Sequence, residues 1–168
     1  MDGNKRELFT FLSEQIVILA AVEGKKVYAT QGESVLCSEA MADMTCLTPC
    51  SHEEADTRIF VHVADAIRRG CTKIAIRTVD TDVVAIAIAQ VHILTPDELW
   101  VAFGTWPNFR YIAVHEIAHT LGPRKSAVLP VFHAFTGCDT TSAFSGRGKK
   151  TAWDIWSVYP EVTEASKS

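Results

Sequence analysis

Apolar side chains near the amino terminus recur every three or four residues, at Leu8, Phe9, Leu12, Ile16 and Leu19. This spacing matches the turn of an α-helix and predicts an amphipathic helix over residues 5–21. After Gly24 the period becomes that of a strand, and residues 27–36 are expected to form a strand that continues around a turn at Gln31–Gly32. Residues 38–51 keep neither period and are expected to be a loop.

The middle of the chain alternates between the two periods. A second helix is predicted from Ser51, a good N-cap residue, to Gly70. Residues 72–79 alternate and are β-branched, which predicts a strand; residues 83–91 are apolar on every side and predict a buried helix; residues 99–103 predict another strand. This β-α-β-α-β order with short connections indicates an α/β fold with a mostly parallel central sheet and helices on both faces.

Shorter elements follow. Residues 109–112 are expected to be a short strand, and residues 114–121 a helix that stops at Gly122. Pro130 suits the first turn of a further helix, and a last helix is predicted over residues 149–158.

The length of 168 residues fits one ordinary domain. Hydrophobic residues make up 48% and charged residues 21%, which excludes a disordered or linker protein. We divide the chain into an N-terminal helix and strand/loop part of the same domain, an α/β core, a helix-hairpin-helix element and a flexible tail, over residues 1–50, 51–136, 137–158 and 159–168.

Neither a membrane nor a secretory location is expected. The longest apolar stretch, residues 83–94, is interrupted by polar side chains and is shorter than a membrane span. The first residues lack the pattern of a cleaved signal. Five cysteines at irregular spacings fit a reducing, intracellular compartment, and Cys46, Cys50 and His52 have no second pair that would favour zinc.

The stretch HEIAHTLG spells a zinc motif. On a helix His115 and His119 lie one turn apart, and Glu116 could activate a metal-bound water, as in zinc metallopeptidases. The position six residues after the second histidine, where one branch of these enzymes has its third ligand, is Lys125. We favour an ordinary solvated helix and keep the metallopeptidase as an alternative.

A stronger signal comes from carboxylates that follow the predicted strands or open the helices: Glu54, Asp56, Asp80, Asp82 and Asp139. Turns at the carboxyl ends of parallel strands meet at one edge of a sheet. Clustered carboxylates repel one another unless cations bridge them, and oxygen ligands suit Mg²⁺ or Mn²⁺. Two such ions can hydrolyse a phosphodiester, so this pattern predicts a two-metal nuclease site.

A basic, glycine-rich hairpin precedes the last helix and consists of Gly146, Arg147, Gly148, Lys149 and Lys150. Glycines let backbone N–H groups approach a phosphate, and lysines at a helix start add positive charge. The net charge of −4 supplies no general attraction to nucleic acid, so any such contact is local. We predict that this hairpin binds the nucleic-acid backbone without reading bases.

In this order E-A-D (54–56), D-T-D (80–82), G-C-D (137–139) and G-R-G-K-K-T-A (146–152) resemble the PIN-like nuclease core of the flap endonuclease and XPG family. The blocks S-H-E-E-A-D-T-R, V-D-T-D-V-V and F-H-A-F-T-G-C-D-T-T-S-A-F also resemble a group of animal proteins with this domain, some of them associated with mobile elements. The resemblance covers about residues 50–158.

The resemblance implies a three-layer PIN-like fold and a structure-specific nuclease. Glu54 and Asp56 would hold one metal ion, and Asp80, Asp82 and Asp139 the second. Asp80 and Asp82 would also be the catalytic residues. The partner would be nucleic acid, DNA with a structured or flap feature, and the location nuclear.

Residues 1–50 match none of the metal-binding aspartates that the family carries in its N-terminal strand. We therefore expect an N-terminally incomplete or degenerate copy of the domain, and its catalytic activity is open. A non-catalytic module that binds nucleic acid or protein is the second hypothesis. Substrate structure, DNA versus RNA, and oligomeric state are left undecided.

Overall fold

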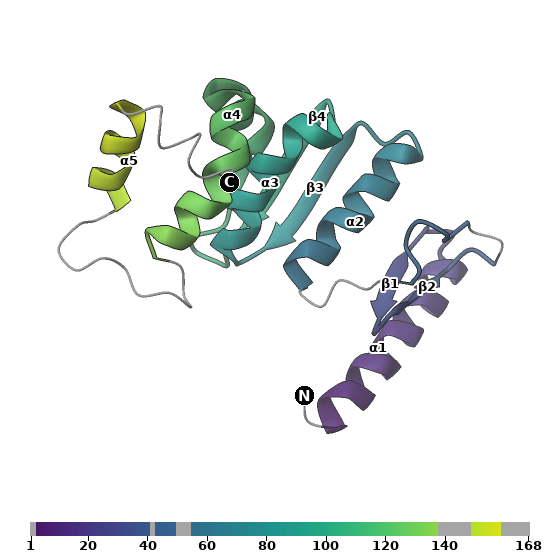
Figure 1. The fold of residues 1–168 in the computed structure, drawn as a ribbon. Coiled ribbons are helices and arrows are strands. Elements are labelled where there is room, and N and C mark those ends of the chain that lie inside the picture. The colour runs from purple at the N-terminus through teal and green to yellow at the C-terminus, as the bar shows by residue number, and fades with distance from the viewer. Residues whose placement is uncertain (1–2, 41–42, 50–54, 138–148, 159–168) are drawn as a thin grey trace. The chain divides into compact units, whose positions relative to one another are not determined.

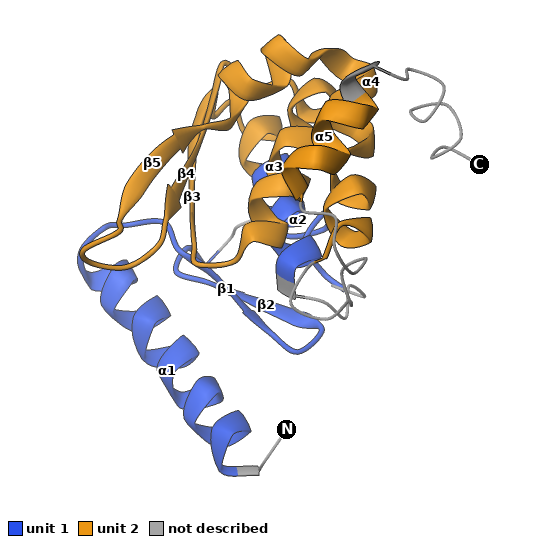
Figure 2. Ribbon diagram, turned by 90° about the vertical axis from the view of Figure 1, so that its left-hand side faces the viewer, with its two compact units in different colours: residues 1–65 blue, residues 66–168 orange. Residues whose placement is uncertain are grey.

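The computed structural model describes residues 3–40, 43–49, 55–137 and 149–158. Within these residues the chain is an α/β protein with five helices and two sheets, as Figure 1 shows. It divides into two compact units, unit 1 (Met1–Asp65) and unit 2 (Ala66–Ser168), which are coloured separately in Figure 2. Each is described by itself.

Unit 1 contains a helix, a β-hairpin and most of a second helix: α1 (Gly3–Val22), β1 (Tyr28–Gln31), β2 (Ser34–Cys37) and α2 (Ala55–Arg68). The predicted first helix and hairpin are confirmed. The strands pair antiparallel with Gln31 opposite Ser34, and Gly32 adopts φ 61°, a left-handed conformation that glycine adopts without strain. The predicted start of α2 at Ser51 lies outside the described residues.

Two polar contacts hold α2 on the hairpin. Arg58 donates to the carbonyl oxygen of Gly32 over 2.9 Å, and His62 Nε2 lies 2.6 Å from the hydroxyl of Thr30. Burial at this contact lowers the pKa of His62.

Unit 2 is built on a three-stranded sheet in the order β3–β4–β5. Its elements are β3 (Lys73–Thr78), α3 (Thr81–Leu94), β4 (Glu98–Phe103), β5 (Arg110–Ala113), α4 (Val114–Phe135) and α5 (Lys149–Val158). The described helices of this unit that follow β3 lie on one side of the sheet in Figure 2. Helix α3 packs on α4 and is buried along most of its length, as the apolar run predicted.

The expectation of a mostly parallel sheet is wrong for the described strands. Strands β3 and β4 are parallel and connected through α3, but β5 pairs antiparallel with β4, with Phe103 opposite Arg110. A parallel strand needs a crossover connection of about a dozen residues or more, and the short loop between β4 and β5 permits only a hairpin.

The helical segments of α4 also differ from the prediction. The break falls at Gly122 as expected, where φ 75° and ψ 165° interrupt the helix. The next segment, however, resumes at once after Gly122, and Pro130 lies inside it. Pro123 therefore takes the first-turn position predicted for Pro130, because a proline needs no hydrogen-bond acceptor there.

Candidate functional site

The turn after β3 places two carboxylates at the start of α3. Asp80 is the N-cap of this helix, and its side chain accepts a hydrogen bond of 2.8 Å from the backbone N–H of Asp82. The backbone N–H of Asp80 in turn donates to the hydroxyl of Thr78 over 3.0 Å. Both carboxylates thus lie at the carboxyl end of a parallel strand and at the positive end of a helix dipole, where negative charge is stabilised.

His133, in the last turns of α4, lies against this turn. Its Nε2 is 2.9 Å from Oδ1 of Asp82 and 3.3 Å from the hydroxyl of Thr81. The His133 side chain is 19% exposed, whereas that of Asp82 is 41% exposed. The Asp82 side chain is therefore in contact with the histidine and still accessible to solvent or to a ligand.

Phe132, next to His133 at the carboxyl end of α4, packs on helix α5. The ring of Phe132 stacks on Trp156 with centroids 4.7 Å apart and meets Trp153 edge-on at 5.5 Å. Trp156 is 3% exposed. This aromatic packing anchors α5, and its first turn presents the exposed side chains of Lys149 and Lys150.

The structure describes only part of the predicted carboxylate cluster. Asp80 and Asp82 are adjacent, and Asp56 lies in the first turn of α2 in unit 1. Glu54 and Asp139 lie outside the described residues, as do the hairpin residues Gly146, Arg147 and Gly148. In the described ranges, no group of three or more His, Cys, Asp or Glu side chains is placed to hold a metal ion.

Sequence reasoning missed His133. The signal was present, since this histidine stands in the block F-H-A-F-T-G-C-D, shortly before the predicted ligand Asp139. A histidine near an acidic motif is a natural partner for a carboxylate, but its packing against Asp82 depends on the crossing of α3 and α4, which local patterns do not reveal.

The HEIAHTLG stretch is only partly the solvated helix that we expected. Glu116 and His119 are exposed, but His115 is buried, with 9% of its surface accessible. Its Nδ1 lies 2.9 Å from the carbonyl oxygen of Leu99 in β4. The same Nδ1 lies 3.3 Å from the backbone N–H of Leu99, so it donates to the carbonyl in one tautomer of the imidazole and accepts from the N–H in the other.

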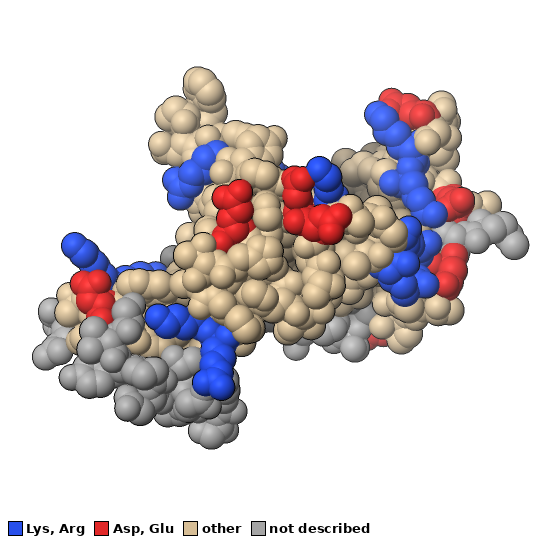
Figure 3. Space-filling model, turned by 90° about the horizontal axis from the view of Figure 1, so that it is seen from above, with Lys and Arg blue, Asp and Glu red and all other residues tan. Residues whose placement is uncertain are grey.

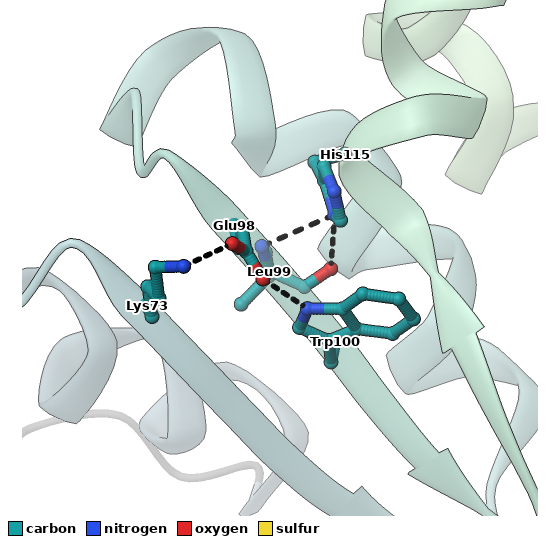
Figure 4. Close-up of polar contacts among 5 residues, drawn as sticks. All are labelled: Lys73, Glu98, Leu99, Trp100 and His115. Carbon is teal, nitrogen blue, oxygen red and sulfur yellow. Dashed lines mark hydrogen bonds and ion pairs between the residues drawn. The ribbon is translucent and has the colours of Figure 1, made fainter.

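The end of β5 explains why His115 is held there. The N–H of Glu98 donates to Thr72 on the β3 side, so by strand alternation the backbone groups of Leu99 point to the β5 side. Strand β5 ends at Ala113, opposite Trp100, and offers Leu99 no partner. His115 takes that place at the start of α4 (Figure 4).

Side chains around His115 complete this network. The indole of Trp100 meets the imidazole edge-on at 5.3 Å and donates to Glu98 over 2.9 Å, and Lys73 donates to the other oxygen of Glu98 over 2.5 Å (Figure 4). The hydrogen bonds from Lys73 and then Trp100 lower the pKa of Glu98. His115 thus has a structural role at the end of the sheet.

Charges on the described surface are mixed. Figure 3 shows acidic and basic side chains interspersed on the face seen from above, without one continuous basic surface. Attraction to a polyanion would therefore depend on small local groups of side chains, in keeping with the net charge of −4.

In comparisons with known proteins, no family model, no curated protein and no solved structure matched the chain. None of the described helices has the length and apolar character that crossing a bilayer requires.

Proposed function

We propose that the chain is a metal-dependent, structure-specific nuclease-like domain that acts on nucleic-acid phosphodiesters. The observation that carries this proposal is the position of Asp80 and Asp82 at the carboxyl end of β3, in contact with the same end of α4 that anchors the lysine-bearing helix α5. The carboxyl end of α4 thus contacts both the acidic turn, through His133, and the helix that carries Lys149 and Lys150, through Phe132. Phosphodiester chemistry uses acidic and basic groups of these kinds.

The described carboxylates fit a hard divalent cation. Mg²⁺ is commonly held by one or two carboxylates, with water and substrate phosphates completing its shell. Asp80 and Asp82 supply that number, although one oxygen of Asp80 caps α3 and one oxygen of Asp82 faces His133. When bound, Mg²⁺ or Mn²⁺ would lower the pKa of a water molecule and neutralise phosphate charge.

The protein residues would divide the remaining work. Asp80 and Asp82 would hold the ion, and His133 would keep Asp82 in one orientation. Lys149 and Lys150 would bind phosphates of the nucleic-acid backbone as point charges. Asp139 as a further ligand of this ion, a second ion held by Glu54 and Asp56, a three-layer PIN-like fold and a hairpin at Gly146–Gly148 are the remaining parts of this proposal. Of these residues the structure describes Asp56.

A non-catalytic nucleic-acid or protein interaction module is the second candidate. It is favoured by the absence, among the described side chains, of any metal-binding group of three or more, and by the contact with His133 that already engages Asp82. If the module binds nucleic acid, it differs from the nuclease only in hydrolysis; if it binds protein, it also differs in its partner.

The test is cleavage of a fluorescent flap DNA in the presence of Mn²⁺. We expect cleavage by the unmodified protein and its loss in Asp82→Asn. Asp97→Asn is the matched control, since Asp97 is an exposed carboxylate just before β4, at the opposite end of the strands. Binding without cleavage by the unmodified protein would establish the interaction module instead, and equal cleavage by Asp82→Asn would refute the assigned site.

The lysines are tested separately, by the salt dependence of DNA affinity. Lys149→Ala combined with Lys150→Ala should flatten the slope of log K against log salt by up to about two phosphate contacts. An unchanged slope would remove α5 from the proposed interface.

A further inference from the structure

One face of the β3–β4–β5 sheet carries exposed aromatic and basic side chains that the proposed acidic site does not use. The strand register places Arg77, Ala102 and Tyr111 in one row across the three strands, so their side chains lie on the same face. The neighbouring row contains Ile76 and Val101, which are buried. Arg77 and Tyr111 are exposed, Tyr111 by 64%.

Two further aromatic side chains lie in the loop between β4 and β5, and one of them, Phe109, contacts this row. The ring of Phe109 meets Tyr111 edge-on with centroids 5.2 Å apart, and the guanidinium of Arg77 lies 5.3 Å from the Phe109 centroid. Trp106 lies in the same loop and is 89% exposed. We refer to Arg77, Trp106, Phe109 and Tyr111 as the aromatic platform.

The loop that supports the platform is held in shape. Arg77 donates to the carbonyl oxygens of Ala102 and Gly104 over 3.0 and 2.6 Å. Gly104 has φ 85°, and a Cβ there would lie 2.9 Å from the carbonyl oxygen of Asn108. The backbone thus closes tightly around the glycine, so the loop that carries Trp106 and Phe109 is held in shape without a ligand.

The charge of the platform is positive. Arg77 contacts carbonyl oxygens and an aromatic ring, and among the described residues no carboxylate lies within ion-pairing distance of it. Carbonyl hydrogen bonds orient a guanidinium but leave its net charge in place. A ligand for this surface therefore has flat apolar parts for the rings and negative charge for Arg77.

We propose that the aromatic platform binds an unpaired nucleic-acid strand, whose bases stack on Trp106 and Tyr111 while Arg77 attracts the phosphates. Aromatic side chains on an exposed sheet face stack two or three bases in known single-strand binders. Such stacking accepts any sequence, because every base has a π-face.

The platform and the acidic turn share one edge of the sheet, since the N–H of Gly104 donates to the carbonyl oxygen of Thr78 over 3.1 Å. A strand bound on the platform would therefore lie at the end of the sheet that carries Asp80. The inference names the unpaired part of the substrate, and in that respect it rests on the proposed function; binding is nevertheless measured without cleavage.

The test is fluorescence anisotropy with labelled oligothymidylate about 20 nucleotides long, long enough for more than one stacking position. We expect Trp106→Leu and Tyr111→Leu each to weaken binding by roughly 5- to 100-fold. Trp106→Phe and Tyr111→Phe keep a ring and should stay within about threefold of the unmodified protein. Phe11→Ala, an exposed aromatic in α1, is the control and should change nothing.

A second readout reports stacking directly. The chain has four tryptophans, and bases that stack on Trp106 should quench a component of the fluorescence that is missing from Trp106→Phe. Circular dichroism of each variant checks that it is folded.

Each outcome decides the proposal. Leucine variants that bind like the unmodified protein, or no binding of the single strand at all, would overturn it. So would equal losses in the leucine and phenylalanine variants, which would indicate that the indole N–H and the phenol O–H make the contacts and that stacking on a ring does not. Single-strand binding with these losses but without cleavage would uphold the platform and refute the nuclease. If both leucine variants cleave and bind like the unmodified protein, the nuclease would be upheld and the platform refuted.

Discussion

Replacing His115 by alanine should destabilise unit 2 strongly, whereas the same change at His119 should not. The two histidines belong to one motif and one helix, but His115 is 9% exposed and bonded to β4, while His119 is exposed. The pair therefore separates a structural role from a zinc-binding role, in which both histidines would matter equally.

The magnitude follows from the contacts of His115. Its removal leaves a buried backbone group of Leu99, the carbonyl or the N–H, without its partner, which costs about 1–3 kcal/mol. It also removes an edge-on contact with Trp100, worth about 0.5–1.5 kcal/mol. Together the free energy of unfolding should fall by about 2–4 kcal/mol, which in a unit of about 100 residues lowers Tm by roughly 10–20 °C.

The assay is calorimetric unfolding of the unmodified protein, His115→Ala and His119→Ala, each with and without zinc. For His119→Ala we expect a change within about 0.5 kcal/mol, as for other exposed positions. His115→Gln should recover part of the loss, because its amide N–H₂ can donate to Leu99. Equal destabilisation by both alanine variants, together with a zinc-dependent rise in Tm that both abolish, would refute the structural role and restore the metallopeptidase.

Three further outcomes are expected. Burial holds the pKa of His62 below its ordinary 6.5, so the unfolded chain takes up the proton first as the pH falls. The stability that the neutral histidine contributes to unit 1 should be complete above about pH 6.5 and decrease as the pH falls toward the folded pKa. Urea unfolding of the unmodified protein and of His62→Gln, measured against pH, checks this. Gly104→Ala should cost about 1–3 kcal/mol more than Gly70→Ala, since both glycines have positive φ but only at Gly104 would a Cβ meet the backbone, at 2.9 Å; denaturation midpoints compare the two. Trp156→Ala should release α5 from Phe132, seen as loss of hydrogen-exchange protection in α5 alone; loss throughout unit 2 would show that α5 is part of the core.

Local patterns predicted most of the elements because their causes are local. The helical period of residues 5–21 and the all-apolar run of residues 83–91 correspond to α1 and α3 within a few residues. The short strand expected at residues 109–112 is β5, displaced by one position. The amphipathic period, the β-branched residues and the glycines that end helices each act over a few neighbouring residues, so these elements can be predicted from a single sequence.

The errors concern connections between elements. The loop of residues 104–109 is too short for a crossover and implies the antiparallel pairing of β5. The expected parallel sheet also included the strand at residues 27–36, which instead forms a separate antiparallel hairpin, β1–β2. The helix start placed at Pro130 was wrong because Pro123, directly after Gly122, satisfies the same rule earlier.

In the candidate site, too, local features could be predicted from the sequence and contacts between elements could not. The capping role of Asp80 before the helix that starts at Thr81 follows from the chain itself. The burial of His115 depends on β5 ending one residue before α4 begins, and the contact of His133 depends on how α4 crosses α3. Such tertiary relations have no signature in a single sequence.

The most direct measurement of the central claim is a calorimetric titration of Mn²⁺ into the unmodified protein, Asp80→Asn and Asp97→Asn. Asparagine caps a helix as well as aspartate does, so Asp80→Asn removes the charge and preserves the start of α3. We predict saturable binding that weakens at least about tenfold in Asp80→Asn and is unchanged in Asp97→Asn. The same affinity in all three proteins, or no binding in any, would contradict a divalent-cation site at the carboxyl end of β3.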